Sequence, residues 1–148
     1  LNPNDTDLMA DFGVRLCLLL DWEKGVPLVE ESFRRNPCQS GTFRMALVLY
    51  HFSERNYEES LRQALLINAP DVVYVHFVVA ACAARLGLHQ KAREALACLE
   101  RIEPDYARRA AADLASRNVH PSLALDLMEA VRDAGMGRIA PRKDTFKA

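Results

Sequence analysis

Four histidines and one nearby serine are the residues that could support acid–base or nucleophilic chemistry. His51 stands two residues before Ser53, and an imidazole so placed could activate a hydroxyl. Both residues end an apolar stretch, however, so a structural position at a helix end explains them. No two of His51, His76, His89 and His120 are four residues apart, the spacing that places two ligands on one helix face. We therefore predict neither a nucleophile–base pair nor a histidine metal site.

The acidic pairs and short glycine clusters also lack the spacing that chemistry requires. Adjacent carboxylates, as at 30–31 and 58–59, do not face each other on a helix. Asp5, Thr6 and Asp7 precede an apolar stretch, where they are expected to cap a helix rather than bind a cation. Residues 135–137 (GMG) do not follow a strand and so are not a phosphate loop. We expect no catalytic residue, metal or cofactor, and predict that the chain is not itself an enzyme.

The four cysteines do not form a recognisable metal or redox motif. Cys17, Cys38, Cys82 and Cys98 include no CxxC pair and have no histidine at ligand spacing. All but Cys38 lie in apolar stretches, where a thiol packs as a small hydrophobic group. Reduced, structural cysteines and a cytoplasmic location are expected.

Charge and hydropathy exclude two classes of partner. The 148 residues are 50% hydrophobic and 26% charged, with 19 basic and 20 acidic side chains. A protein that grips phosphate backbones usually has a basic face, so nucleic acid is disfavoured. No apolar run approaches the roughly 20 residues of a membrane helix, so no membrane partner is expected. Because the chain lacks an initiator Met and a leader, we expect it to be a piece of a longer protein.

The prolines reveal an internal period. Pro3, Pro37, Pro70 and Pro104 are separated by 34, 33 and 34 residues. Within each interval, apolar residues recur at spacings of three and four on both sides of a short polar break. Periods of this length are typical of stacked helical pairs.

The helices themselves can be placed from this pattern. We expect a helix over 6–20, a break at 21–23 and a second helix up to Pro37. In the next repeat, Asn56 and Glu59 have the spacing of a capping box, so a helix is expected to start there. The stretch 72–86 is apolar nearly all round, so other helices must cover it on several sides; Gly87 ends it and 88–101 forms its partner. Two shorter helices are expected over 106–117 and 122–134.

The residues at the predicted helix crossings resemble those of the tetratricopeptide repeat (TPR) family. In that family, small residues lie where two helices cross and a proline ends the second helix. The corresponding small residues here are Gly13, Gly25, Ser60, Ala80 and Ala92. Trp22 matches the aromatic residue at the turn, with Tyr57 aligned to it in a middle repeat that fits less well. The resemblance implies an all-α fold, a right-handed α-solenoid of antiparallel helix pairs.

The same resemblance implies a division of the chain. Residues 1–135 would form the solenoid, with the end of a preceding repeat at 1–3, repeats at 4–37, 38–70 and 71–104, and a capping helix pair at 105–135. Residues 136–148 would form a flexible tail.

A partner-binding groove is implied next, because the first helices of TPR repeats line the concave side. It would be lined by Val14, Cys17, Arg44, Met45, His51, Tyr74, Phe77 and Arg85. Such a groove could hold an extended peptide or an amphipathic helix. The Lys and Asn set of the family's carboxylate clamp is not found, and each lining residue could instead pack between helices.

Residues 104–135 are also similar to the C-terminal repeat regions of bacterial signalling proteins that carry an adenylate cyclase or winged-helix domain. This resemblance implies a protein interaction scaffold, the regulatory or assembly module of a larger protein. Two alternatives stay open: a structural spacer or homo-oligomerisation element, and a substrate-presenting arm of an enzyme whose catalytic domain is missing from this piece.

Overall fold

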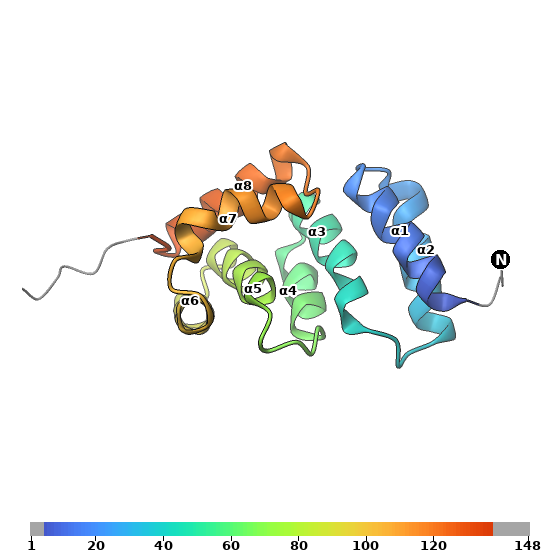
Figure 1. Cartoon of the computed structure of the whole chain (residues 1–148), viewed down its shortest axis with the longest axis horizontal. Coiled ribbons are helices and arrows are strands. Elements are labelled where there is room, and N and C mark those ends of the chain that lie inside the picture. Colours follow the sequence, from blue (N-terminus) through green and yellow to red (C-terminus); the bar gives the residue numbers. More distant parts are fainter. Residues whose placement is uncertain (1–4, 138–148) are drawn as a thin grey trace, which may run out of the picture.

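The computed structural model describes residues 5–137, which form eight α-helices, one 3-10 helix and no strand. In chain order these are α1 (Thr6–Leu18), α2 (Trp22–Arg35), η1 (Gly41–Arg44), α3 (Met45–Ser53), α4 (Tyr57–Leu65), α5 (Val73–Arg85), α6 (His89–Ile102), α7 (Tyr106–Ser116) and α8 (Pro121–Asp133). Figure 1 shows them as four successive helix pairs. The predicted all-α class is confirmed.

Two predicted boundaries are wrong, one between the first two helices and one at the start of the tail. The break before the second helix lies at 19–21 rather than 21–23, because Trp22 already begins α2. The predicted tail does not start at 136, because Met136 is buried and its N–H donates to the carbonyl of Val131. Residues 1–3 and 138–148, the predicted repeat end and the rest of that tail, lie outside the described residues.

Each helix pair is joined by the same kind of turn. The first helix ends with one residue of positive φ, namely Leu20 (63°), Arg55 (59°), Gly87 (70°) or Asn118 (58°). In every turn the N–H of the next residue donates to a carbonyl five residues earlier, at 2.8–3.1 Å. This is the hydrogen bond of a Schellman motif, which satisfies the last carbonyls of a helix. The prediction that Gly87 ends its helix is confirmed.

Helices α1 and α2 cross at two glycines, Gly13 and Gly25. A methyl group built on Gly25 would lie 2.6 Å from Cys17 Sγ and 2.7 Å from the carbonyl oxygen of Gly13. The predicted contact of the helices at Gly13 and Gly25 is therefore confirmed. Ser60 is equally buried in α4, and its hydroxyl donates to the carbonyl of Val48 at 2.8 Å.

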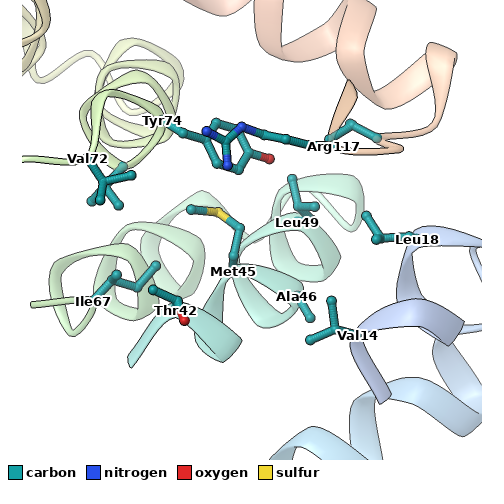
Figure 2. Close-up of a pocket in the computed structure, with 12 residues that line it drawn as sticks. Val14, Leu18, Thr42, Met45, Ala46, Leu49, Ile67, Val72, Tyr74 and Arg117 are labelled. Atoms are coloured by element: carbon teal, nitrogen blue, oxygen red, sulfur yellow. The ribbon is translucent and has the colours of Figure 1, made fainter. Parts of the chain in front are cut away.

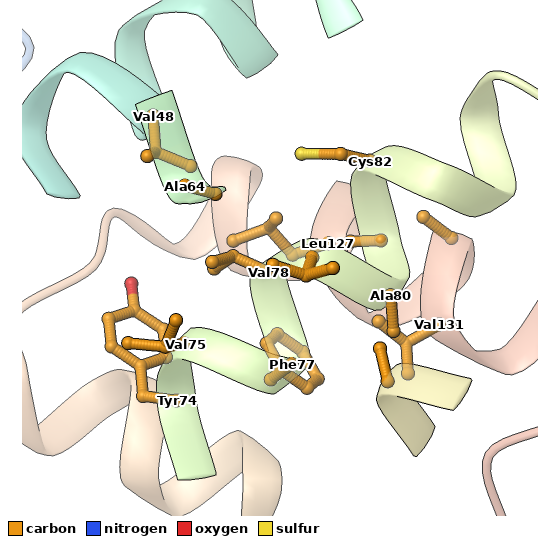
Figure 3. Packing of buried hydrophobic residues seen from close by; sticks show 14 of the residues in the cluster. Val48, Ala64, Tyr74, Val75, Phe77, Val78, Ala80, Cys82, Leu127 and Val131 are labelled. Atoms are coloured by element: carbon orange, nitrogen blue, oxygen red, sulfur yellow. The ribbon is translucent and has the colours of Figure 1, made fainter. Parts of the chain in front are cut away.

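Helix α5 lies in the centre of the larger core, as its apolar sequence predicts. Nine of its thirteen residues are buried. Helices α4, α6 and α8 all pack against it, and Figure 3 shows Phe77 and Val78 beside Leu127 and Val131 of α8. A smaller core of six buried residues joins α1 and α2 to α3. The α7–α8 pair therefore covers α5, chiefly through α8 and with Tyr106 of α7 against Phe77.

The α1–α2 crossing makes a prediction about stability. Gly25→Ala should lower the free energy of unfolding by about 2 kcal/mol, since the added methyl group must push the helices apart. In an unobstructed helix the same change would be stabilising. Urea unfolding followed by circular dichroism measures the difference.

Gly41→Ala is the matched control, because a methyl group there would lie 3.4 Å from its nearest neighbours, an ordinary contact. A change within about 0.5 kcal/mol is expected. Equal effects of the two substitutions would contradict the close crossing.

Candidate protein-interaction surface

An apolar hollow of about 160 Å³ lies where α1, α3, the start of α5 and the α7–α8 turn meet (Figure 2). Its lining residues are Val14, Leu18, Thr42, Met45, Ala46, Leu49, Ile67, Val72, Tyr74, Val75, Arg117 and Val119. Arg117 is the one charged residue among them. The hollow thus combines apolar walls with a single cation at its rim.

Two connections between helices supply part of this lining. Ile67 follows α4, and its N–H donates to the carbonyl of Ala64 at 3.1 Å. Val119 is in the α7–α8 turn, where its N–H donates to Leu114 at 3.1 Å in the Schellman motif described above. Both apolar side chains are buried. A backbone hydrogen bond therefore fixes each of these two connections where it lines the hollow.

Tyr74 brings a polar atom to the hollow. The residue is 5% exposed, and its hydroxyl oxygen, closed to water, has no hydrogen-bond partner among the described residues. The guanidinium carbon of Arg117 lies 4.4 Å from the centre of the ring, a cation–π contact. Burial raises the pKa of Tyr74 well above its usual range, so the hydroxyl stays protonated at neutral pH.

Asp113 holds Arg117 in this position. Its Oδ2 accepts hydrogen bonds from Arg117 Nε at 3.1 Å and from the Tyr106 hydroxyl at 2.7 Å, and Arg109 Nη1 lies 3.7 Å from Oδ1. Burial by itself would raise the pKa of Asp113, but these hydrogen bonds and the two guanidinium charges outweigh it, and the pKa is lowered. The two Nη atoms of Arg117 have no hydrogen-bond partner within residues 5–137.

Three of the eight predicted groove residues line the hollow. Val14, Met45 and Tyr74 reach it from α1, α3 and α5 respectively. The first helices of three successive pairs thus contribute to one depression. Whether a partner binds there stays a prediction.

Two other predicted groove residues belong to the core, so their assignment to the groove is wrong. Cys17 is 1% exposed at the α1–α2 crossing, and burial raises the pKa of its thiol to about 11. Phe77 is fully buried, with its ring 5.8 Å from that of Tyr106. Cys17 is buried because α2 packs against it at Gly25, and Phe77 is buried because α7 and α8 cover the side of α5 that the prediction left open.

The remaining three predicted residues lie away from the hollow. Arg44 stacks on Phe33 at 4.1 Å and its Nη1 donates to Gln63 at 3.0 Å. The ring of His51 contacts that of Tyr50 at 5.0 Å. Arg85 forms an ion pair of 3.2 Å with Asp133 of α8. The structure explains all three as contacts within or between helix pairs.

Arg117, Ile67 and Val119 were missed because they lie in connections rather than in first helices. The Asn118-Val119-His120-Pro121 sequence does indicate a turn, but the local sequence does not determine which helices lie next to that turn. Only the packing of α8 on α5 brings residues 117 and 119 to the hollow.

The other residues considered for chemistry have structural partners. The Ser53 hydroxyl donates to the Tyr50 carbonyl at 2.6 Å, and a ring nitrogen of His76 lies 2.7 Å from the carbonyl oxygen of Pro70. Asp5 accepts from the N–H of Leu8, so the predicted cap of the first helix is confirmed. Asn56 accepts from the N–H of Glu59, but the Glu59 carboxylate accepts from Arg62 and Gln63 and the Asn56 N–H donates to the His51 carbonyl, so only half of the predicted capping box forms. Within residues 5–137, no three His, Cys, Asp or Glu side chains are arranged to hold a metal ion. None of the described helices has the length and apolarity to cross a membrane.

Comparison of the chain with protein-family models, curated proteins and solved structures found no match. The function is therefore inferred from the geometry and from the sequence pattern.

The two buried tyrosines predict opposite effects of the same substitution. Tyr74→Phe should raise the free energy of unfolding by about 1 kcal/mol, because it removes a buried hydroxyl without a partner. Tyr106→Phe should lower it by about 2 kcal/mol, because the Asp113 carboxylate loses a hydrogen bond. Urea unfolding of both variants at pH 7 measures the pair. A similar loss in both would mean that the Tyr74 hydroxyl has a partner after all.

Asp113 makes a prediction about pH. A carboxylate whose pKa is lower in the folded than in the unfolded chain contributes stability that is complete above the unfolded pKa, about 3.8, and is lost as the pH falls below it. Asp113→Asn should therefore be less stable than the natural chain at pH 7, and the difference should shrink between pH 5 and pH 2. Asp126→Asn, exposed on α8, is the control and should show no such trend. A difference that is constant with pH would contradict the ion-pair role.

Proposed function

We propose that this chain is a TPR-like helical-repeat module that binds a segment of another protein at the hollow between α1, α3 and α5. The observation that carries the proposal is the apolar hollow itself, to which Val14, Met45 and Tyr74 contribute from three successive first helices. Single apolar residues on a surface are ordinary, whereas an apolar depression is the kind of surface at which proteins bind ligands, and this supports the proposal.

The regular construction of the helix pairs supports the repeat part of the proposal. All four pairs have a turn residue in the same left-handed conformation and the same closing hydrogen bond. Small residues lie at equivalent places in the second helices, namely Gly25, Ser60 and Ala92, all buried. A right-handed α-solenoid is the arrangement that such units form when each covers the next.

The volume of the hollow sets the size of what enters it. A cavity of about 150 Å³ accepts benzene in other proteins. The hollow here has about 160 Å³, so one Leu, Met or Phe side chain of a partner fits. Such a buried anchor is the usual source of binding energy in a peptide groove.

The wider role follows from the resemblance of residues 104–135 to repeat regions of bacterial signalling proteins. In this proposal the chain is the regulatory or assembly module of such a protein and works in the cytoplasm. Its partner is a protein or peptide, and the module itself carries out no reaction.

Self-association is a second candidate, favoured by the outer face of α1. Three large apolar residues are exposed there, namely Leu8, Phe12 and Leu19, and Phe12 is 56% exposed. Leu8 and Phe12 are four residues apart and so share one face of the helix. A second copy of the chain could bury this face.

Binding of displayed peptides separates the two candidates. Random twelve-residue peptides are selected on the full chain, and their affinities are measured for Val14→Glu and Phe12→Glu. Val14→Glu places a charge in the hollow and should weaken binding at least tenfold. Phe12→Glu, on the outer face of the same helix, should leave it unchanged.

Thermal unfolding checks that both variants fold. If Val14→Glu does not fold, Thr42→Trp, at the exposed rim of the hollow, takes its place as the variant that should weaken binding. Selected peptides that bind the Val14 and Thr42 variants as tightly as the natural chain would overturn the proposed site. A dimer in sedimentation that Phe12→Glu dissociates would establish the second candidate.

A further inference from the structure

The hollow contains two polar features that a purely apolar anchor does not require. One is the buried hydroxyl of Tyr74, which has no partner, and the other is the Arg117 guanidinium, whose Nη atoms have none among the described residues. Figure 2 shows both groups together at one side of the hollow, away from Val14. The hydroxyl and the guanidinium are both hydrogen-bond donors, so a single acceptor group of a partner could bind both.

The hydroxyl defines what kind of group that acceptor is. A buried donor without an acceptor destabilises a protein, so such groups are rare in folded chains. The Tyr74 hydroxyl is protonated at neutral pH and can therefore donate a hydrogen bond to an incoming oxygen atom. Within residues 5–137 no acidic side chain lines the hollow to take that place.

Arg117 defines the charge of the acceptor. Asp113 engages only Nε, which fixes the direction of the guanidinium and leaves its two outer nitrogens available. The side chain is 41% exposed, so a partner can reach it. Charge-assisted hydrogen bonds from a guanidinium to a carboxylate are about twice as strong as neutral ones.

We propose that the partner segment carries an Asp or Glu next to the apolar side chain that fills the hollow, and that this carboxylate accepts hydrogen bonds from Arg117 and Tyr74. The inference rests on the proposed function and specifies the chemistry of the partner. Because the Tyr74 oxygen is closed to water, Arg117 turns from the ring toward the carboxylate as the partner enters, and the hydroxyl becomes accessible.

The apolar walls explain why an anion alone is not the ligand. Nine of the twelve lining residues are Val, Leu, Ile, Ala or Met, and a free anion would leave these side chains uncovered. An acid and an apolar group on neighbouring residues of one peptide satisfy both parts of the hollow at once.

Blocked dipeptides test the inference directly. Acetyl-Asp-Phe-amide, acetyl-Asn-Phe-amide and acetyl-Asp-Ala-amide are titrated into the full chain labelled at its methyl groups, and the NMR signals of Met45 and Ile67 are followed. The first should shift both signals in a saturable way. Loss of the carboxylate should weaken binding about tenfold, the effect of one charge-assisted hydrogen-bonding group, and loss of the ring should abolish the shifts.

Variants then assign the preference to its residues. Arg117→Gln should remove the preference for Asp over Asn while keeping the shifts caused by the phenyl ring. Tyr74→Phe should reduce the preference about threefold without unfolding the chain. Arg108→Gln, an exposed arginine on α7 with no ion pair among the described residues, should leave the preference intact.

The outcomes distinguish the two levels of the proposal. Equal binding of the Asp and Asn dipeptides, or a preference that survives Arg117→Gln, overturns the acidic partner. If displayed peptides still depend on Val14, the proposed function then stands without it. If neither dipeptides nor displayed peptides act at the hollow, both proposals fail.

Discussion

Helix α5 is buried on most of its surface, and the arrangement of the other helices follows from that. A helix with buried residues on nearly every side has to be covered from several directions at once. Helices α4 and α6 provide two of these covers, and the chain has to return to provide the third, which is α8. Burial of α5 therefore determines the position of the last helix pair and, through it, of the α7–α8 turn.

The site is a consequence of the same constraint. With α8 on α5, the turn that carries Arg117 and Val119 lies beside Tyr74 at the start of α5, although the residues are more than forty positions apart in sequence. Asp113 then orients Arg117, while its contact with Tyr106 connects the rim of the hollow to the core. A charged group is thus held against apolar surroundings by a carboxylate that also accepts a hydrogen bond from Tyr106 and lies near Arg109, the arrangement that makes a half-buried ion pair tolerable.

Local features of this fold could be predicted from sequence because their causes are local. The caps at Asp5 and Asn56 and the covered helix 72–86 follow from residue type and spacing, and the contact at Gly13 and Gly25 was expected from the resemblance of the helix crossings to those of TPR repeats. The left-handed conformations of Leu20 and Arg55 could not be predicted, since they are unfavourable for these residue types and packing of the paired helices imposes them, whereas Asn118 is of a type that adopts this conformation readily. Phe77 was wrongly assigned to the surface because α7 and α8, which cover it, are distant in sequence and a local pattern does not place them, whereas Cys17 was wrongly assigned although the helix that covers it is the next one along the chain. Arg117 was missed because only the packing of α8 on α5, which a local pattern does not show, brings it to the hollow.

The two cores differ in size, and this difference bears on how the hollow behaves. Val14 and Leu18 come from α1, which packs chiefly on α2 and, through six buried residues, on α3, whereas Tyr74 and Val75 come from the larger core. Segments with fewer buried contacts open at lower free energy than the centre of a domain. The α1 wall of the depression is therefore expected to open at lower free energy than the α5 wall, so a tilt of the first helix pair is the way in which partner side chains of different size would be accommodated.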